Sequence, residues 1–349
     1  MKLQKIHYHF PSELRFDPVS KDWILIATGR AKRPETFAKE KRKEAAPSSK
    51  TCPFCHLGKE KTILEYKDEK GEPPRRGEPR LAKRGEWFVK VVPNKFPAFS
   101  SNEGLNKREE GPYQVMDGVG FAEVVVTRDH TRSMAQFSIP EIKQVLDAYQ
   151  ERYLDLMNEK FVNYVSIFHN HGKEAGASIY HPHSQIITHP IIDPDLRRSL
   201  TGSAEYWRKY KKCVHCAMLE FDKKDGRRIV FENKDFIVVC PFASRIAFEV
   251  RIYPKKHRAY FERIEDGEKE SLAEAFQVAL SKLNKALNDP AYNFFLHTAP
   301  CDGKNYDHYH WHFEILPKTG TWAGFELGTG IEISTIEPET AAEYLRKQQ

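Results

Sequence analysis

The feature that most constrains this chain is an internal repetition that spans most of its 349 residues. Each copy opens with a Cys-x-x-Cys pair and continues through two β-rich segments, one helix-like segment and two further β-rich segments, the last of which is marked by His-x-His. Repetition on this scale indicates one supersecondary unit built twice, and the chain is long enough for two such units. We therefore expect an N-terminal unit over residues 1–195 and a C-terminal unit over residues 196–349.

The hydrophobic pattern predicts the same elements in both copies. Strands are expected at 86–93, 121–130, 163–170 and 181–187, and again at 234–241, 248–257, 292–297 and 310–317. Apolar residues at helical spacing predict one amphipathic helix in each copy, over 138–160 and 268–287. Ser138 and Glu141 form a capping-box pattern at the start of the first helix.

Composition narrows the class of protein. Hydrophobic residues make up 40% of the chain and charged residues 30%, which is typical of a globular fold and not of a disordered one. The net charge of +6 is mild for this length, so it allows a small anionic ligand and does not favour nucleic acid. No run approaches the ~18 apolar residues of a membrane span, and the first residues lack the apolar core of a signal peptide. We therefore expect a cytoplasmic protein without a membrane partner.

The two Cys-x-x-Cys pairs indicate metal sites. A thioredoxin-type redox pair is the alternative, but such a pair follows directly after a strand, whereas Cys52 follows the loop-like run APSSKT. Each pair is followed by a His at a strand end and by a His-x-His motif, which together complete a tetrahedral Cys2His2 set. This ligand chemistry favours two structural Zn ions per chain. The ligands are Cys52, Cys55, His130 and His181 in the first site, and Cys213, Cys216, His257 and His310 in the second.

His183 is left beside the first site without a metal role. Strand alternation places His181, His183 and Gln185 on one face. A neutral imidazole is a good nucleophile toward phosphorus, and the Gln185 amide can donate to a phosphoryl oxygen as charge develops. The alternative is that His183 is a polar residue that only packs near the metal. In the second copy the corresponding pair is His312 and Glu314, and a carboxylate there should repel a phosphate and silence that copy.

These motifs resemble the histidine-triad superfamily and, within it, the galactose-1-phosphate uridylyltransferase family. The resemblance implies an α+β, duplicated histidine-triad-like fold with an antiparallel half-barrel sheet, flanking helices and a homodimeric assembly. It also implies a covalent nucleotidyl-histidine at His183, with Gln185 contacting the phosphate. The matching stretches are Arg30–Pro34, Cys52–Cys55, Asp129–His130, Gly176–Ser178, His181–Gln185, Asn288–Pro290, His297–Pro300, His310–His312 and Gly324–Gly330.

The resemblance further assigns substrate contacts. It implies that Arg30, Arg33, Asn170 and Ser178 touch phosphates, that Asn94 lies near the base and that Glu326 holds sugar hydroxyls. The second Cys pair and the run from Phe325 to Gly330 are similar to a related branch, the ADP-glucose phosphorylase-like proteins.

We therefore expect a UDP-glucose–hexose-1-phosphate uridylyltransferase that uses a nucleotide sugar and a hexose 1-phosphate in ping-pong transfer. One alternative is an ADP-glucose phosphorylase or adenylyltransferase of the same family. Another, from a different class, is a zinc-stabilised nucleotide-binding module without turnover.

Overall fold

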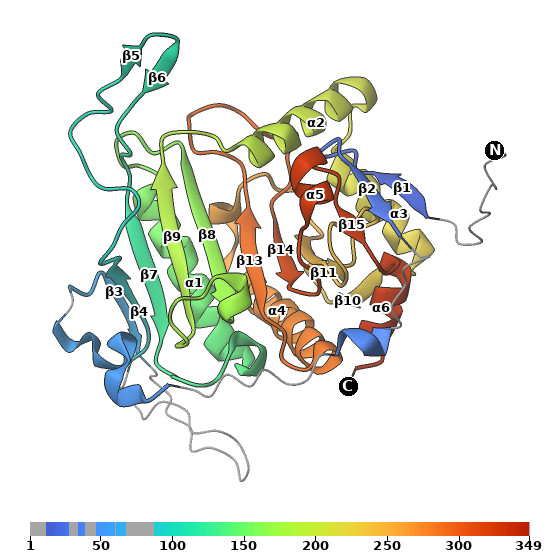
Figure 1. Ribbon diagram of the computed structural model, residues 1–349, viewed down its shortest axis with the longest axis horizontal. Coiled ribbons are helices and arrows are strands. Elements are labelled where there is room, and N and C mark those ends of the chain that lie inside the picture. Colours follow the sequence, from blue (N-terminus) through green and yellow to red (C-terminus); the bar gives the residue numbers. More distant parts are fainter. Residues whose placement is uncertain (1–11, 28–33, 39–46, 60, 68–86, 349) are drawn as a thin grey trace, which may run out of the picture.

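The computed structural model describes residues 12–27, 34–38, 47–59, 61–67 and 87–348. Ten strands form one antiparallel sheet in the order β10-β11-β12-β14-β13-β8-β9-β7-β4-β3 (Figure 1). The strands are β1 (Glu13–Phe16), β2 (Trp23–Ile26), β3 (Leu64–Lys67), β4 (Trp87–Pro93), β5 (Arg108–Glu110), β6 (Tyr113–Val115), β7 (Ala122–Thr127), β8 (Tyr164–His171), β9 (His183–His189), β10 (Ile229–Glu232), β11 (Phe236–Val239), β12 (Val250–Pro254), β13 (Tyr292–His297), β14 (His312–Pro317) and β15 (Ile333–Ser334). The helices are α1 (Ile139–Leu156), α2 (Pro194–Tyr210), α3 (Val214–Asp225), α4 (Asp266–Leu287), α5 (Gly324–Thr329) and α6 (Pro338–Arg346).

The order of the strands repeats about the centre of the sheet. From one edge, the first half reads β3-β4-β7-β9-β8, and from the other edge the second half reads β10-β11-β12-β14-β13. Along the chain, α1 lies between β7 and β8 in the first half, and α4 lies between β12 and β13 in the second. The halves meet where β8 pairs with β13, with Asn170 opposite Asn293. The sheet is therefore continuous across the two copies, and the expected α+β class is confirmed.

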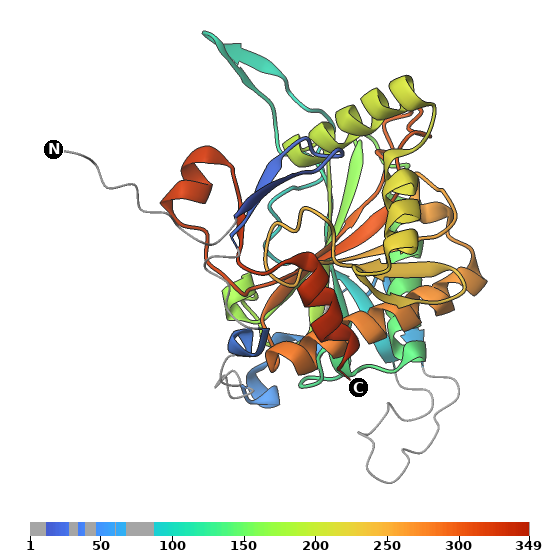
Figure 2. The same ribbon diagram turned by 90° about the vertical axis from the view of Figure 1, so that its right-hand side faces the viewer.

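Two strands from the N-terminal part of the chain pack with the second half of the fold. Strands β1 and β2 form a small separate sheet with β15, which comes from the C-terminal part of the chain. A division into units near residue 195 thus remains a proposal, with residues 13–26 packed on the C-terminal side of it. Figure 2 shows α6 beside α4, and both figures show the β5–β6 hairpin projecting from the body.

Helices α1 and α4 fill one face of the sheet because each carries an apolar stripe. The stripe of α1 is buried against residues of β4, β7, β8 and α4 in one continuous core. Ser138 precedes α1, and its backbone N–H donates to the Glu141 carboxylate at 2.8 Å, which confirms the predicted capping box. The buried stripe of α1 comprises Ile142, Val145, Leu146, Tyr149, Tyr153 and Leu156.

The opposite face is covered by the segments that carry the cysteine pairs. In the first half, Cys52, Phe54 and Leu57 pack on Val124 and Val126 of the sheet. In the second half, Leu219 of α3 packs on Ile237, Val239 and Tyr253. The pair-bearing segments are thus anchored to the sheet by apolar contacts of their own, on the face away from α1 and α4.

Several expectations about element limits were wrong, among them the strand expected to reach His257, because β12 ends at Pro254. Strands β9 and β14 begin at His183 and His312, so His181 and His310 lie just before their strands; in the first copy Pro182 lacks the N–H that the ladder requires. Strand β7 ends at Thr127, because Asp129 accepts hydrogen bonds from the next backbone N–H groups and turns the chain. Helices α2 and α3 occupy the segment between the copies, where only a joint was expected.

Within the described residues, no helix combines the length and the apolar character needed to cross a membrane.

A buried ion pair joins α1 to β7 and offers a test of this architecture. Arg152 donates twice to the Glu123 carboxylate, at 2.7 Å each, and both side chains are buried. We expect Glu123→Gln to lower the free energy of unfolding by about 3 kcal/mol, because the buried guanidinium then keeps only the exposed Asp155 carboxylate as a charged partner. The double variant Glu123→Leu/Arg152→Met should recover most of that loss in urea unfolding. Equal destabilisation of the single and double variants would contradict this assignment.

Candidate functional site

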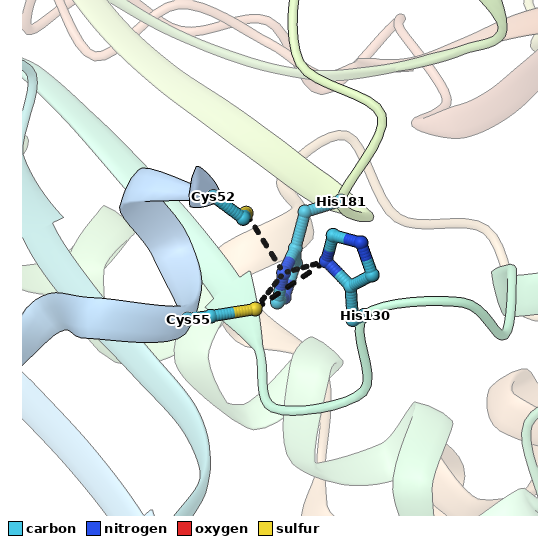
Figure 3. Close-up of side chains that lie close together, drawn as sticks. All are labelled: Cys52, Cys55, His130 and His181. Atoms are coloured by element: carbon cyan, nitrogen blue, oxygen red, sulfur yellow. Dashed lines mark hydrogen bonds between the residues drawn. The ribbon is translucent and has the colours of Figure 1, made fainter. Parts of the chain in front are cut away.

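The structure brings the four predicted ligands of the first site together from three separate segments. Cys52 and Cys55 come from the segment before and within Pro53–Lys59, His130 from the turn after β7, and His181 from the residues before β9 (Figure 3). The Cys55 sulfur lies 3.3 Å from His130 Nδ1 and 3.5 Å from His181 Nδ1. The Cys52 sulfur lies 3.5 Å from His181 Nδ1, and the two Nδ1 atoms are 3.3 Å apart.

These short contacts suit a cation held between the four side chains. His181 Nε2 faces the Thr127 carbonyl at 2.6 Å and His130 Nε2 faces the Pro47 carbonyl at 2.7 Å. A carbonyl only accepts, so each Nε2 carries the proton and each Nδ1 presents a lone pair. Burial lowers the pKa of His181 to about 4, so its ring is neutral near pH 7. Two lone pairs facing each other at 3.3 Å repel unless a positive ion lies between them.

The spacing matches a tetrahedral ion. With metal–sulfur bonds of ~2.3 Å and metal–nitrogen bonds of ~2.0–2.1 Å, tetrahedral geometry separates two nitrogens by about 3.3 Å and a sulfur from a nitrogen by about 3.5 Å. The sulfur–nitrogen distances of 3.3–3.5 Å and the nitrogen–nitrogen distance of 3.3 Å in this cluster are close to these values. The donor set therefore fits a closed, four-ligand metal site that leaves no position for a substrate.

The second predicted set has the same construction. The Cys216 sulfur lies 3.5 Å from Nδ1 of both His257 and His310. The Nε2 atoms of these histidines face the carbonyls of Asp307 and Pro254, so their Nδ1 atoms also present lone pairs. The ligand atoms of these residues and Cys213 all lie within 4.8 Å of one another. Both sets can thus hold a metal ion in the same way.

A third cluster occupies the position in the second half that corresponds to His183 and Gln185. His297, His312 and Glu314 bring one ligand atom each to within 4.8 Å. Arg251 Nε lies 3.2 Å from the Glu314 carboxylate, and Arg245 lies 3.6 Å from it. Burial opposes ionisation, but the charges of Arg251, His297 and Arg245 outweigh it and hold the pKa of Glu314 below its ordinary value.

This network bears on the silence of the second copy, which stays a prediction. The two arginines that pair with Glu314 also pair with Glu249 and Glu332, so they do not serve Glu314 alone. The His312 ring stacks on Tyr253 at 4.6 Å and on His297 at 4.9 Å between ring centroids. His297, His312 and Glu314 together line a cavity in the second half of the fold.

His183 has the geometry of a nucleophile. It lies 2.8 Å from the His181 carbonyl through Nδ1, so Nδ1 carries the proton and Nε2 presents a lone pair. Burial lowers the pKa of His183, so the ring stays neutral at pH values at which an exposed histidine begins to take up a proton. The Phe54 ring packs against the imidazole at 4.9 Å between centroids. His181, a residue of the first Cys2His2 cluster, thus fixes the tautomer of His183 through its own backbone.

The strand that carries His183 is held from its other face. Ser184 points toward α1, where its hydroxyl lies 2.5 Å from the Tyr149 hydroxyl and 2.9 Å from His169 Nδ1. Gln185 points the opposite way and is half-buried on the face of His183, opposite Val124 and Phe168 of the neighbouring strands. The expected sharing of one face by His183 and Gln185 therefore agrees with the strand register.

The remaining candidates are placed as follows. Arg30 and Arg33 lie outside the described residues. Asn94 follows β4, and its side-chain oxygen accepts the Phe96 backbone N–H at 3.0 Å. Asn170 lies near the end of β8, and the loop that carries Ser178 connects β8 to β9.

Glu326 is separate from these residues. It lies in α5, where its carboxylate accepts the Ala323 backbone N–H at 3.0 Å. Figure 1 shows α5 in the second half of the fold, away from β9.

The sequence analysis missed one residue that contacts the candidate phosphate-binding residue Asn170. Asn293 of β13 donates a hydrogen bond of 2.7 Å to the Asn170 side chain. No motif marks Asn293; the available signal is that it alternates with the core residues Tyr292 and Phe294. Its pairing with β8 depends on how the two halves join, which strand periodicity alone does not give.

Metal analysis tests the two clusters. We expect protein purified without chelators to hold two tightly bound metal ions per chain. Cys213→Ser should remove one ion and lower the thermal midpoint of unfolding, because metal binding contributes to folding free energy. The matched control is Cys240→Ser, which alters a buried cysteine outside both clusters and should keep both ions. One ion or none in the unaltered protein would contradict the assignment.

Comparisons with known proteins agree with this geometry. Residues 87–193 match the family model "Galactose-1-phosphate uridyl transferase, N-terminal domain". The chain is 32% identical to an ADP-glucose phosphorylase of Arabidopsis thaliana, over 96% of this chain and 92% of that protein. It is 28% identical to a galactose-1-phosphate uridylyltransferase of Thermotoga maritima, over 97% of this chain and 98% of the relative.

Solved structures of both kinds of enzyme are similar to this chain over nearly its whole length. A crystal structure of an Arabidopsis thaliana ADP-glucose phosphorylase with bound ADP-glucose superposes with a TM-score of 0.78 at 28% identity, covering 97% of this chain and 100% of that one. A structure of a uridylyltransferase gives a TM-score of 0.71 at 28% identity, covering 96% and 97%. The chain therefore belongs to the galactose-1-phosphate uridylyltransferase family and is an enzyme of the nucleotidyltransferase type.

Proposed function

We propose that this enzyme transfers a nucleotidyl group from a nucleotide sugar to a phosphate acceptor through a covalent intermediate on His183. The observation that carries the proposal is the hydrogen bond from His183 Nδ1 to the His181 carbonyl, which leaves the Nε2 lone pair available for attack. His181 itself is not available, because its Nδ1 faces the cysteine sulfurs of the first cluster.

The proposed reaction has two balanced steps. In the first, His183 Nε2 attacks the α-phosphorus, a nitrogen–phosphorus bond forms, and the bond to the bridging oxygen breaks with release of sugar 1-phosphate. In the second, an oxygen of the acceptor phosphate attacks the same phosphorus, and the nitrogen–phosphorus bond breaks to regenerate neutral His183. Each attack builds negative charge on the phosphoryl oxygens, which preorganised hydrogen-bond donors stabilise.

The chain offers donors for that charge. Gln185 is the nearest candidate because it shares the face of His183 one pleat along β9. By family resemblance we assign Asn170 and Ser178 to the phosphates as well, together with Arg30 and Arg33. We assign Asn94 to the base and Glu326 to the sugar hydroxyls on the same ground.

The donor that the comparisons favour is ADP-glucose. The similarity to the Arabidopsis ADP-glucose phosphorylase is higher than to the Thermotoga uridylyltransferase, in identity and in TM-score against the solved structures of each kind. The second Cys2His2 cluster also fits the ADP-glucose phosphorylase-like branch. Phosphorolysis would then yield glucose 1-phosphate and ADP, with inorganic phosphate as the acceptor.

Uridylyl transfer is the second candidate. Residues 87–193 match the uridyl transferase family model, and the Thermotoga relative is similar over nearly the whole of both chains. In that case UDP-glucose is the donor and galactose 1-phosphate the acceptor. The expected uridylyltransferase activity therefore remains a candidate, with the ADP-glucose alternative at least as well supported.

We further propose zinc as the metal in both Cys2His2 sites, because thiolate and imidazole donors in tetrahedral geometry suit that ion. With four protein ligands, each ion would hold chain segments together and take no part in the chemistry. A homodimer and a cytoplasmic location stay predictions from family resemblance and from the sequence.

The nucleophile is tested by substitution. We expect His183→Ala to lower turnover by several orders of magnitude while thermal stability and metal content persist, because the only covalent route is lost. His183→Gly should regain transfer when an imidazole–nucleotide adduct is supplied, since the vacated space matches an imidazole. The matched control is His312→Ala at the duplicate position, which should keep its activity. Near-normal transfer by His183→Ala would overturn the mechanism.

The donor is tested by covalent labelling. The protein is incubated with ADP-glucose or UDP-glucose labelled at the α-phosphorus and then quenched, and acid-labile, base-stable label is counted. We expect label from ADP-glucose, mapping to His183 and released as ADP by inorganic phosphate. Stronger labelling from UDP-glucose, discharged by galactose 1-phosphate, would select uridylyl transfer. Uptake of neither label would indicate a binding module without turnover.

A further inference from the structure

The side chain of Asn293 makes two hydrogen bonds that cross from the second half of the fold into the first. Its Nδ2 lies 2.8 Å from the Ala175 carbonyl and 2.7 Å from Asn170 Oδ1. Ala175 belongs to the loop between β8 and β9 that continues to Ser178. Asn293 thus contacts two parts of the proposed phosphate site at once.

These contacts fix the orientation of Asn170. The Ala175 carbonyl only accepts, so the Asn293 atom that faces it must be the amide nitrogen. The same nitrogen also faces Asn170, so the Asn170 atom opposite it must be the oxygen. The Asn170 amide nitrogen, a donor, is therefore turned away from Asn293. A Cβ at Gly176 would lie 4.0 Å from this nitrogen, which places the donor beside the loop that carries Ser178.

The side chains of Asn293, Asn170 and His183 lie in one row across the sheet. Asn293 pairs directly with Asn170. On the other side of β8, Phe168 pairs with Gln185 and His169 with Ser184, so the same register brings Asn170 level with His183. Neighbouring strands are ~4.8 Å apart, which puts Asn293 about 10 Å from His183, too far for contact with the reacting phosphorus.

We propose that Asn293 is a positioning residue: it holds the Asn170 amide with its donor directed to the phosphoryl group that His183 attacks. This assignment rests on the proposed function. It implies that the second half of the chain orients a group in the working copy. Without Asn293, the Asn170 amide is free to rotate and to present its oxygen, which repels a phosphoryl oxygen.

The alternative is a purely structural role, in which Asn293 only holds the loop between β8 and β9 in place. The bond to Ala175 also ties the loop to the sheet, so any loss of activity could follow from loosening that loop. Asn163 supplies a matched control, because its amide donates to the Pro190 carbonyl at 2.7 Å from the far end of β8. Asn163→Asp removes the same kind of bond at a distance from His183.

The experiment measures the rate of nucleotidyl-His183 formation with saturating labelled ADP-glucose and UDP-glucose, together with KM and thermal stability. The variants are Asn293→Asp, Asn293→Ala, Asn163→Asp, Asn170→Ala and the double variant Asn170→Ala/Asn293→Ala. We expect both Asn293 variants to form the intermediate about 10- to 100-fold more slowly, with little change in KM, because the lost interaction acts on transition-state charge. Asn163→Asp should keep the normal rate.

The double variant separates a role of Asn293 that acts through Asn170 from one that only holds the loop. If Asn293 acts through Asn170, adding Asn293→Ala to Asn170→Ala should change the rate by less than about twofold. A further loss that multiplies the two single effects would overturn the positioning role. Normal rates in both Asn293 variants would do the same while leaving the proposed function intact. A parent enzyme that forms no labelled His183 with either donor would overturn the proposed function and this assignment with it.

Discussion

The antiparallel pairing of β8 with β13 is the interaction on which the rest of the structure depends. Through it, two five-stranded halves become one sheet, with Asn170 opposite Asn293 at the join. A shared sheet gives both halves common faces: α1 and α4 fill one with a single apolar core, and the cysteine-bearing segments cover the other. A slip of one residue at this seam would turn every side chain of one half to the wrong face. The seam therefore determines where the site face lies and which residues of the second half can reach it.

The first Cys2His2 cluster is linked to the proposed nucleophile through the backbone. His181 gives its Nδ1 to the first cluster and its carbonyl to His183 Nδ1. A residue that anchors the strand start thus also sets the tautomer of the proposed nucleophile two positions later. Ser184 secures the same strand from behind, through Tyr149 and His169. The imidazole is consequently preorganised before any substrate binds, which reduces the reorganisation that the first chemical step requires.

The two copies differ in what surrounds their second histidine. In the first copy, the residue two positions on is the half-buried Gln185, next to a row of polar side chains. In the second, Glu314 is paired with Arg251 and Arg245, and His312 is enclosed between Tyr253 and His297. The residues of the second copy thus support one another through packing and ion pairs, beside a cavity lined by His297, His312 and Glu314. Under the positioning role proposed for Asn293, that support extends to the working copy.

The sequence by itself determined the repeated unit, the helices α1 and α4 with the Ser138 capping box, and the eight cysteine and histidine residues of the two clusters, because these follow from periodicity and local spacing. It also singled out His183 and Gln185, since alternation along a strand needs no tertiary information. It misplaced the starts of β9 and β14 by two residues and gave no sign of α2 and α3. The pairing of Asn293 with Asn170, and the compensation of Glu314 by Arg251, were decided only by the tertiary structure. Each joins residues distant in the chain through the register of neighbouring strands, and that register is set by how the packed halves meet.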